Sequence, residues 1–131
     1  MRKHLALWIG LIPLIAFAQE YKRYTVQKDK LSIQLSEGIL NISPLSDKVI
    51  RIQWVKNSMK ETQEFVLINK PALPDFKITE TPLLLKLSTN KITVEFNKQN
   101  GAIHFINKSG KVFLSEKAGT RKCTLDVDNT Q

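Results

Sequence analysis

The stretch from Lys91 to Leu114, KITVEFNKQNGAIHFINKSGKVFL, alternates apolar and polar residues and contains two dipeptides that favour turns, Asn100-Gly101 and Ser109-Gly110. Alternation with a period of two is typical of β-strands, because successive side chains of a strand point to opposite faces. The stretch therefore predicts three strands joined by tight turns. It contains few residues of the kind that carry out catalysis.

The alternation also assigns side chains to faces. Ile92, Val94 and Phe96 would share a buried face, which Ile103 and Phe105 would continue on the next strand. The opposite face would carry Thr93, Glu95, Ala102, His104 and Ile106.

Two further features of this region predict local structure. Asn100-Gly101 fits a type I′ turn, which requires positive φ at both central residues. Leu83, Leu84 and Leu85 would place apolar groups on both faces of one strand, as expected for a central strand that is covered on both sides.

Similar short segments follow one another along most of the chain, and no helical period is present after residue 18. Gly, Pro, Asn, Asp and Ser separate them. Spacing this short leaves no room for the crossover helices of a parallel sheet, so an all-β, antiparallel β-sandwich is predicted. The ten predicted strands are residues 23–28, 31–35, 38–43, 48–54, 64–68, 75–80, 83–88, 91–96, 102–107 and 111–116.

Residues 1–18 have the pattern of a cleavable signal peptide. A basic MRKH precedes an apolar run, and Ala16-Phe17-Ala18 supplies a small-x-small cleavage site. The 14 residues from position 5 to position 18 are fewer than the ~20 that a helix needs to cross a bilayer. We expect a mature chain that begins at Gln19, is secreted or periplasmic, and has no membrane anchor. Because Gln19 stands where a lipoprotein would have Cys, lipid attachment is not expected at this site.

Removal of residues 1–18 leaves 113 residues, which suffice for one modest domain but not for an additional catalytic domain. The lone Cys123 cannot form an internal disulfide, so it is either free or lacks a partner present elsewhere. The net charge of +8 falls to +6 without Arg2 and Lys3. Nucleic-acid binding is not expected because the basic residues are dispersed, and the lysines are interpreted as a solvated outer face of strands.

No catalytic, cofactor-binding or metal-binding residue is predicted. The acidic residues Glu64, Glu80, Glu95 and Glu116 stand singly on polar strand faces or at strand ends, which is typical of solvated surface. His104 is the one histidine after the signal segment and has no Cys or second His nearby, so it is interpreted as lying on a half-covered sheet face.

Two other groups were candidates for binding sites. Asp126, Asp128 and Thr130 have the alternate spacing of calcium ligands, but Gln131 replaces the required Gly and no distal Glu follows, so calcium is not predicted. The aromatic residues Trp54, Tyr21 and Tyr24 could stack on sugar rings, but their alternate strand positions favour the core.

Two segments, GILNISPLSDKVIRIQW (residues 38–54) and LLLKLSTNKITVEFNKQNGAIHFINKSGKVFLSEK (residues 83–117), resemble the N-terminal β-sandwich of glycoside hydrolase family 31, the α-glucosidase and α-xylosidase family. The matching parts are the strand Val49–Ile52, the lead-in Leu87–Thr89, and the paired strands that end in Lys108–Leu114. The resemblance covers about residues 22 to 117.

The resemblance implies a mutarotase-like sandwich, spanning residues 19–131 and incomplete, that precedes a catalytic (β/α)₈ barrel. It implies that the full enzyme cleaves α-glycosides with retention, using two aspartates that both lie on the barrel, and none of the family's catalytic motifs is present in this chain. The expected function is therefore that of a non-catalytic piece of a secreted or periplasmic α-glycosidase, whose partners are carbohydrate and the missing barrel. The alternative is a free-standing exported β-sandwich that binds carbohydrate or protein.

Overall fold

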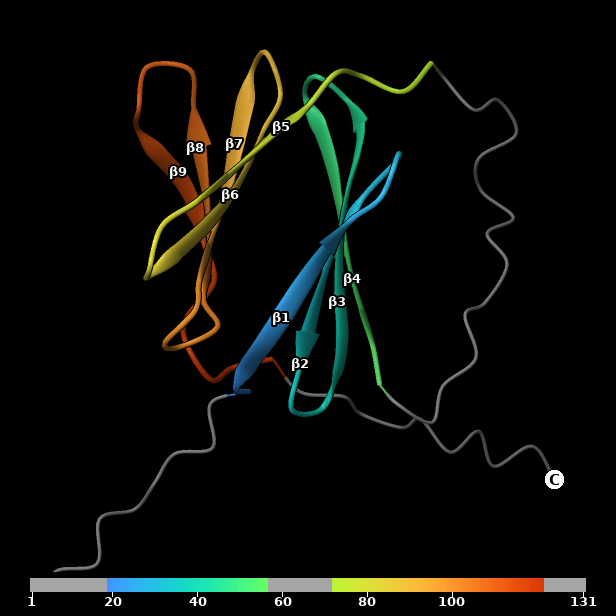
Figure 1. Cartoon of the computed structure of the whole chain (residues 1–131). Helices are drawn as coiled ribbons and strands as arrows, with labels where there is room; N and C mark the ends of the chain where they lie inside the picture. Colours follow the sequence, from blue (N-terminus) through green and yellow to red (C-terminus); the bar gives the residue numbers. More distant parts are fainter. Residues whose placement is uncertain (1–18, 57–71, 122–131) are drawn as a thin grey trace, which may run out of the picture.

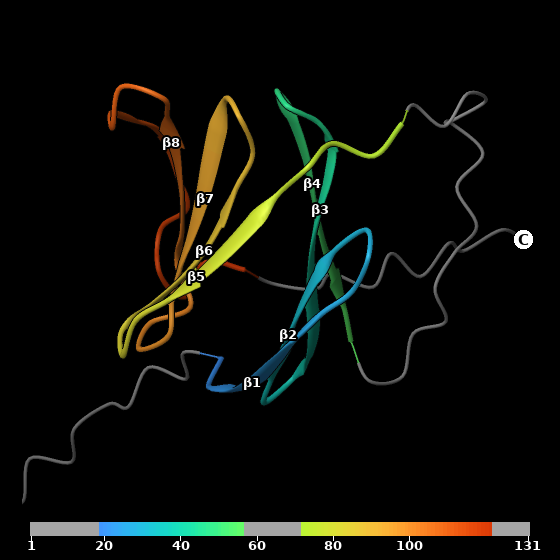
Figure 2. The same ribbon diagram turned by 45° about the horizontal axis from the view of Figure 1, so that its top comes forward.

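The chain folds into two antiparallel β-sheets that face each other, as Figures 1 and 2 show. The structure is a computed structural model and describes residues 19–56 and 72–121. All the regular elements within these ranges are strands, which confirms the predicted all-β sandwich. The predicted signal peptide and the predicted strand at residues 64–68 lie outside the described residues.

Each sheet is a meander in which strands pair in the order of the sequence. Every pairing between described strands is antiparallel, as the short spacing predicted. The four-stranded sheet consists of β1 (Tyr21–Val26), β2 (Leu31–Leu35), β3 (Gly38–Ser46) and β4 (Val49–Val55). The five-stranded sheet consists of β5 (Lys77–Glu80), β6 (Leu84–Ser88), β7 (Ile92–Asn97), β8 (Ile103–Asn107) and β9 (Val112–Ser115).

The core lies between the two sheets and takes alternate residues from their inner strands. Phe96 pairs with Ile103 and Val94 pairs with Phe105, so these side chains share the inner face as the alternation predicted. The buried cluster contains Leu31, Ile33, Leu35, Leu40 and Ile42 from the four-stranded sheet and Leu85, Leu87, Val94, Phe96 and Ile103 from the five-stranded sheet.

The aromatic residues considered for sugar stacking pack against this core, which confirms the core interpretation. The Tyr21 and Phe96 rings lie 6.3 Å apart with a tilt of 49° between them, a favourable aromatic arrangement across the sandwich. Trp54 packs with its indole body on the core, and its Nε1 donates a hydrogen bond of 3.0 Å to the carbonyl oxygen of Glu37. None of the three rings is therefore presented as an open stacking platform.

The turn between β7 and β8 differs from the predicted type I′ turn. Among the described residues, only glycines have positive φ, so Gly101 has a φ of 71° while Asn100 remains on the negative side. The Asn97 side-chain oxygen accepts hydrogen bonds from the backbone N–H groups of Gln99 and Asn100 at 2.9 and 3.2 Å. This side chain stabilises the start of a four-residue loop, residues 98–101, so that a single left-handed position at its end closes the hairpin.

The prediction that Leu83–Leu85 belong to a strand covered on both faces is also wrong. β6 lies inside its sheet, between β5 and β7, but Leu83 precedes it and is 50% exposed. Leu85 and Leu87 are fully buried on the inner face, whereas Leu84 is only half-buried on the outer face. Among the described residues, the five-stranded sheet is covered on one face only, and its outer face carries polar side chains such as Lys86 and Glu95.

The edge strand β9 exposes apolar side chains. Val112, Phe113 and Leu114 are 45%, 53% and 56% exposed. A register shift places Phe113 between two paired positions, and its ring lies 6.3 Å from that of Phe105. Within the described part of the fold, this strand therefore combines an edge that no other strand pairs with and apolar groups that nothing covers.

Candidate functional site

The described glutamates that were candidates for catalysis are each held by a different cation. The Lys86 ammonium lies 2.8 Å from the Glu95 carboxylate on the outer face of the five-stranded sheet, and Lys98 and Arg121 pair with Glu80 and Glu116. The interpretation of these acids as merely solvated was therefore incomplete. Glu95 shows this best, since its side chain is only 15% exposed. Glu64 lies outside the described residues.

Glu80 is the centre of a cluster that ties the two sheets together at their β1–β5 edges. The Tyr24 hydroxyl donates a hydrogen bond of 2.9 Å to one oxygen of the Glu80 carboxylate, and the Lys98 ammonium donates to the other. Lys98 also donates to the carbonyl oxygen of Thr81 at 3.0 Å and lies 5.2 Å from the centre of the Tyr21 ring. Side chains from β1, β5 and the β7–β8 loop therefore meet at one carboxylate.

The electrostatics of this cluster suit a structural role for Glu80 better than a role as a catalytic acid. The hydrogen bonds from Lys98 and then Tyr24 lower the pKa of Glu80 from its ordinary value of 4.5. The hydrogen bond to Glu80 in turn raises the pKa of the Tyr24 hydroxyl. A carboxyl group that acts as a general acid near neutral pH needs a raised pKa instead.

The lowered pKa of Glu80 predicts how the stability of the fold depends on pH. The charged carboxylate contributes stability that is complete above the unfolded-state value near 4.5 and is lost as the pH falls through the lower folded-state pKa. We expect wild type to have a higher Tm than Glu80→Gln at neutral pH, and the difference to shrink as the pH falls below about 4.5. Thermal unfolding followed by circular dichroism across this pH range measures both.

Glu37→Gln is the matched control, because the Glu37 side chain makes no ion pair with any described residue and only its carbonyl oxygen is used, by Trp54. Its Tm should track that of wild type across the same range. If the Tm of Glu80→Gln were lower than that of wild type by the same amount at every pH, the charge of the carboxylate would not contribute to stability.

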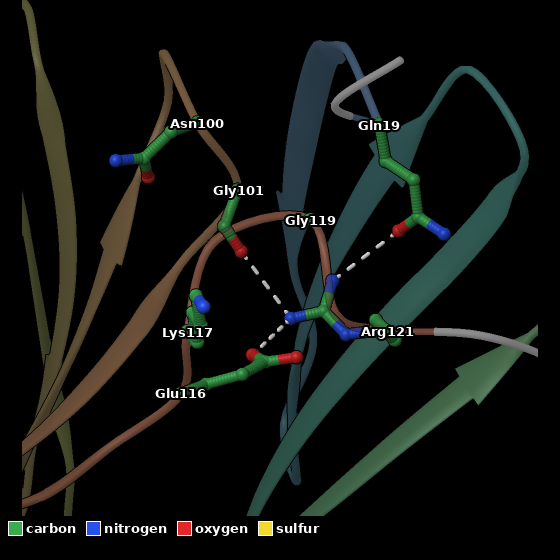
Figure 3. Close-up of a pocket in the computed structure, with 7 residues that line it drawn as sticks. All are labelled: Gln19, Asn100, Gly101, Glu116, Lys117, Gly119 and Arg121. Carbon is green, nitrogen blue, oxygen red and sulfur yellow. Dashed lines mark hydrogen bonds and ion pairs between the residues drawn. The ribbon is translucent and has the colours of Figure 1, made fainter. Parts of the chain in front are cut away.

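A small polar pocket lies where the segment after β9 reaches the start of β1, as Figure 3 shows. The Arg121 guanidinium donates to the side-chain oxygen of Gln19 at 3.3 Å and to the carbonyl oxygen of Gly101 at 3.2 Å, and it pairs with Glu116. The cavity volume of about 30 Å³ suits a water molecule and is too small for a sugar ring. The lining residues are Gln19, Asn100, Gly101, Glu116, Lys117, Gly119 and Arg121.

The residues of this pocket hold two distant segments of the chain together. Arg121 is 102 positions from Gln19 in the sequence, yet its contacts hold the segment after β9 beside the start of the four-stranded sheet. The sequence did not predict the roles of Arg121 and Lys98, because no local sequence pattern identifies a residue that bonds to a distant part of the chain.

The outer face of the four-stranded sheet carries a hollow lined largely by polar side chains. Ser32 donates a hydrogen bond of 2.8 Å to the Asn41 side-chain oxygen, and Asn41 is only 8% exposed. The Gln34 amide bonds to the carbonyl oxygens of Leu35 and Gly38, each at 3.3 Å. The hollow is lined by Arg23, Thr25, Gln27, Lys30, Ser32, Gln34, Ile39, Asn41 and Val55. Such groups could donate and accept hydrogen bonds with a polar ligand, although no aromatic ring is among them.

His104 lies half-buried on the outer face of β8, as its position predicted, and pairs in register with Glu95 and Ser115. Across residues 19–56 and 72–121, no group of three His, Cys, Asp or Glu side chains could hold a metal ion. Asp126, Asp128, Thr130 and Cys123 lie outside those ranges. The same ranges contain no helix with the length and apolar character needed to cross a membrane.

Comparison with known proteins gives a likeness at the level of structure. No protein-family model matches the sequence, and no curated protein matches it. The fold is similar to that of a family 31 glycoside hydrolase, a dextranase of Flavobacterium johnsoniae solved as a mutant complexed with isomaltotriose, with a TM-score of 0.68 and 17% identity. The match covers 79% of this chain and 13% of that enzyme, so the chain spans only a small part of its length. The β-sandwich described here is therefore a fold that also occurs within a family 31 glycoside hydrolase.

Proposed function

We propose that this chain is a non-catalytic, N-terminal β-sandwich portion of an exported α-glycosidase that hydrolyses α-linked glucosides or xylosides. The observation that carries the proposal is the likeness to the family 31 dextranase, with a TM-score of 0.68 over 79% of the chain. The sequence resemblance to the N-terminal sandwich of the same family agrees with it. In this proposal the sandwich is a scaffold, and the reaction takes place on a separate catalytic barrel.

The arrangement of the described carboxylates supports the non-catalytic role. Retaining glycosidases need two carboxyl groups about 5 Å apart across the scissile bond. Glu80, Glu95 and Glu116 instead each form an ion pair with a separate cation. In the full enzyme we assign both catalytic carboxylates to the barrel.

The exposed edge strand supports the proposal that more of the enzyme packs here. Val112, Phe113 and Leu114 expose about half of their surface on a strand whose outer edge pairs with no described strand. Open, apolar edges favour unwanted association unless another segment covers them. Chain beyond the described residues would cover this edge in the complete protein.

The test compares the 131-residue chain with a version continued into the downstream coding sequence, both expressed with residues 1–18 in place. We expect the longer product to hydrolyse aryl α-glucoside or α-xyloside in the exported fraction, and the 131-residue chain to show no activity above buffer. Hydrolysis by the shorter chain would overturn the non-catalytic role. Activity confined to the cytoplasm would overturn export.

The second candidate is a free-standing exported module that binds carbohydrate or protein. The polar hollow on the outer face of the four-stranded sheet favours it, because hydroxyl and amide groups there could bond to a saccharide. A stop codon directly after Gln131, together with a monomeric chain that unfolds cooperatively and binds glycans, would establish this candidate over the first.

A further inference from the structure

The meander topology gathers lysines that are dispersed in the sequence at one end of the sandwich. Four hairpin turns lie at this end, β1–β2, β3–β4, β6–β7 and β8–β9, and Figure 1 shows the last three side by side at the top. The Thr89 hydroxyl donates a hydrogen bond of 2.7 Å to the carbonyl oxygen of Asp47, which joins two of these turns across the sheets. We call the set of turn lysines the basic end: Lys28, Lys30, Lys48, Lys91, Lys108 and Lys111.

The basic end is not neutralised by the described part of the chain. Its six lysines are accompanied by two turn acids, Asp29 and Asp47, and by Asp75, which lines a hollow beside Lys28. None of the six forms an ion pair with a described residue. Other cations among the described residues do form ion pairs, including Lys22, Lys86, Lys98 and Arg121. The lysines were expected on the outer faces of strands, but most of the described ones lie on turns. At the basic end their charges add to one local positive field.

A shallow hollow opens at this end, on the outer face of the five-stranded sheet between the β6–β7 and β8–β9 turns. Lys91 and Lys108 are exposed at its margin. Inside it, the Ser88 and Thr93 hydroxyls lie 3.0 Å apart across the strand pair, and Asn107 uses its side-chain oxygen within its own turn. The complete lining is Lys86, Ser88, Thr89, Asn90, Lys91, Ile92, Thr93, Ile106, Asn107, Lys108 and Gly110.

The chemistry of this hollow combines cations with neutral hydrogen-bonding groups. Hydroxyl and amide side chains both donate and accept, which matches the hydroxyl groups of a sugar ring. Lysine ammonium groups act as flexible point charges that can neutralise carboxylates without a fixed geometry. Arginine, which is favoured for recognition of phosphate and nucleic acid, is absent from the four turns.

We propose that the basic end binds an acidic oligosaccharide, with uronate carboxylates on the turn lysines and ring hydroxyls in the hollow. This site goes beyond the proposed function and does not depend on hydrolysis. Binding is therefore measured directly, and its failure would leave the proposed α-glycosidase role intact.

The experiment titrates the 131-residue chain with a galacturonate hexamer by isothermal calorimetry, using a neutral glucose hexamer as the comparison. The variant Lys91→Gln/Lys108→Gln/Lys111→Gln removes three charges from the basic end. The control Lys22→Gln/Lys56→Gln/Lys117→Gln removes three charges elsewhere, so the two variants have the same net charge. We expect the turn variant to bind the acidic hexamer about tenfold more weakly than wild type, and the control to change by less than about twofold.

Added salt should weaken binding to the acidic hexamer, and the neutral hexamer should not bind. Equal losses in the two variants would overturn the proposal in favour of general charge attraction. Competition by inorganic polyphosphate as strong as that by the galacturonate hexamer would overturn it in favour of a phosphate site. Absence of binding to the acidic hexamer by wild type would also overturn it, and Tm values for all three proteins check that each is folded.

Discussion

Replacing Phe96 with alanine is expected to destabilise the sandwich by about 3–5 kcal/mol. Phe96 is fully buried, is among the largest fully buried side chains of the described residues, and packs against the Tyr21 ring of the other sheet. The substitution removes the ring and leaves a cavity between rigid sheets that cannot close around it. Because small domains have a total stability of about 5–15 kcal/mol, we expect much of this protein to unfold at moderate urea concentrations. Urea unfolding followed by circular dichroism measures the loss.

Phe113→Ala is the matched control, because it makes the same chemical change at a position that is 53% exposed on β9. We expect it to cost no more than about 1 kcal/mol, since about half of this residue is already in water. Similar losses in the two variants would mean that the core is not where the structure places it.

The strands and their inner faces could be predicted because the signal is local. In β7 and β8, the alternation of the sequence predicts which apolar side chains lie on the inner face, because neighbouring side chains of a strand point to opposite sides. Val94 and Ile103 are accordingly buried where the pattern placed them. The same pattern cannot reveal what covers a face, and this is why Leu83 was predicted as buried but is half exposed.

Turn geometry was less predictable because it depends on a side chain outside the turn motif. Asn100-Gly101 alone favours two positive φ angles, but the Asn97 side chain bonds to the loop backbone and leaves only Gly101 left-handed. The β8–β9 turn uses the same device, since the Asn107 side-chain oxygen accepts from the N–H groups of Ser109 and Lys111. An Asn two or three positions before the turn dipeptide is therefore the signal that the dipeptide rule overlooks.

Contacts between distant residues could not be predicted from one sequence. Tyr24 and Glu80 are 56 positions apart, and Arg121 and Gln19 are 102 apart. Each pair depends on how the two meanders face each other, which the local pattern does not determine. The basic end has the same origin, because the lysines become neighbours only after the hairpin turns align.

Replacing Gly38 with alanine is expected to destabilise the four-stranded sheet by about 3 kcal/mol or more, for two reasons that add. Gly38 has a φ of 116°, which residues with a side chain rarely adopt. A Cβ there would also lie 2.2 Å from the carbonyl oxygen of Val55 and 2.9 Å from the Cα of Lys56. Both are backbone atoms, so the clash can be relieved only by separating β3 from the end of β4, where Ile39 pairs with Val55. Thermal and urea unfolding measure the loss.

Gly110→Ala separates these two reasons. Gly110 also has a positive φ, 84°, but a Cβ there would meet nothing within 4 Å. This variant therefore carries the backbone strain without the clash, and we expect it to lose only about 1 kcal/mol. The difference between the two variants then measures the close approach of the β2–β3 turn to the end of β4. If Gly38→Ala were no worse than Gly110→Ala, the close backbone contact at Val55 would not exist in solution, and the β3–β4 pairing would have to end before residue 55.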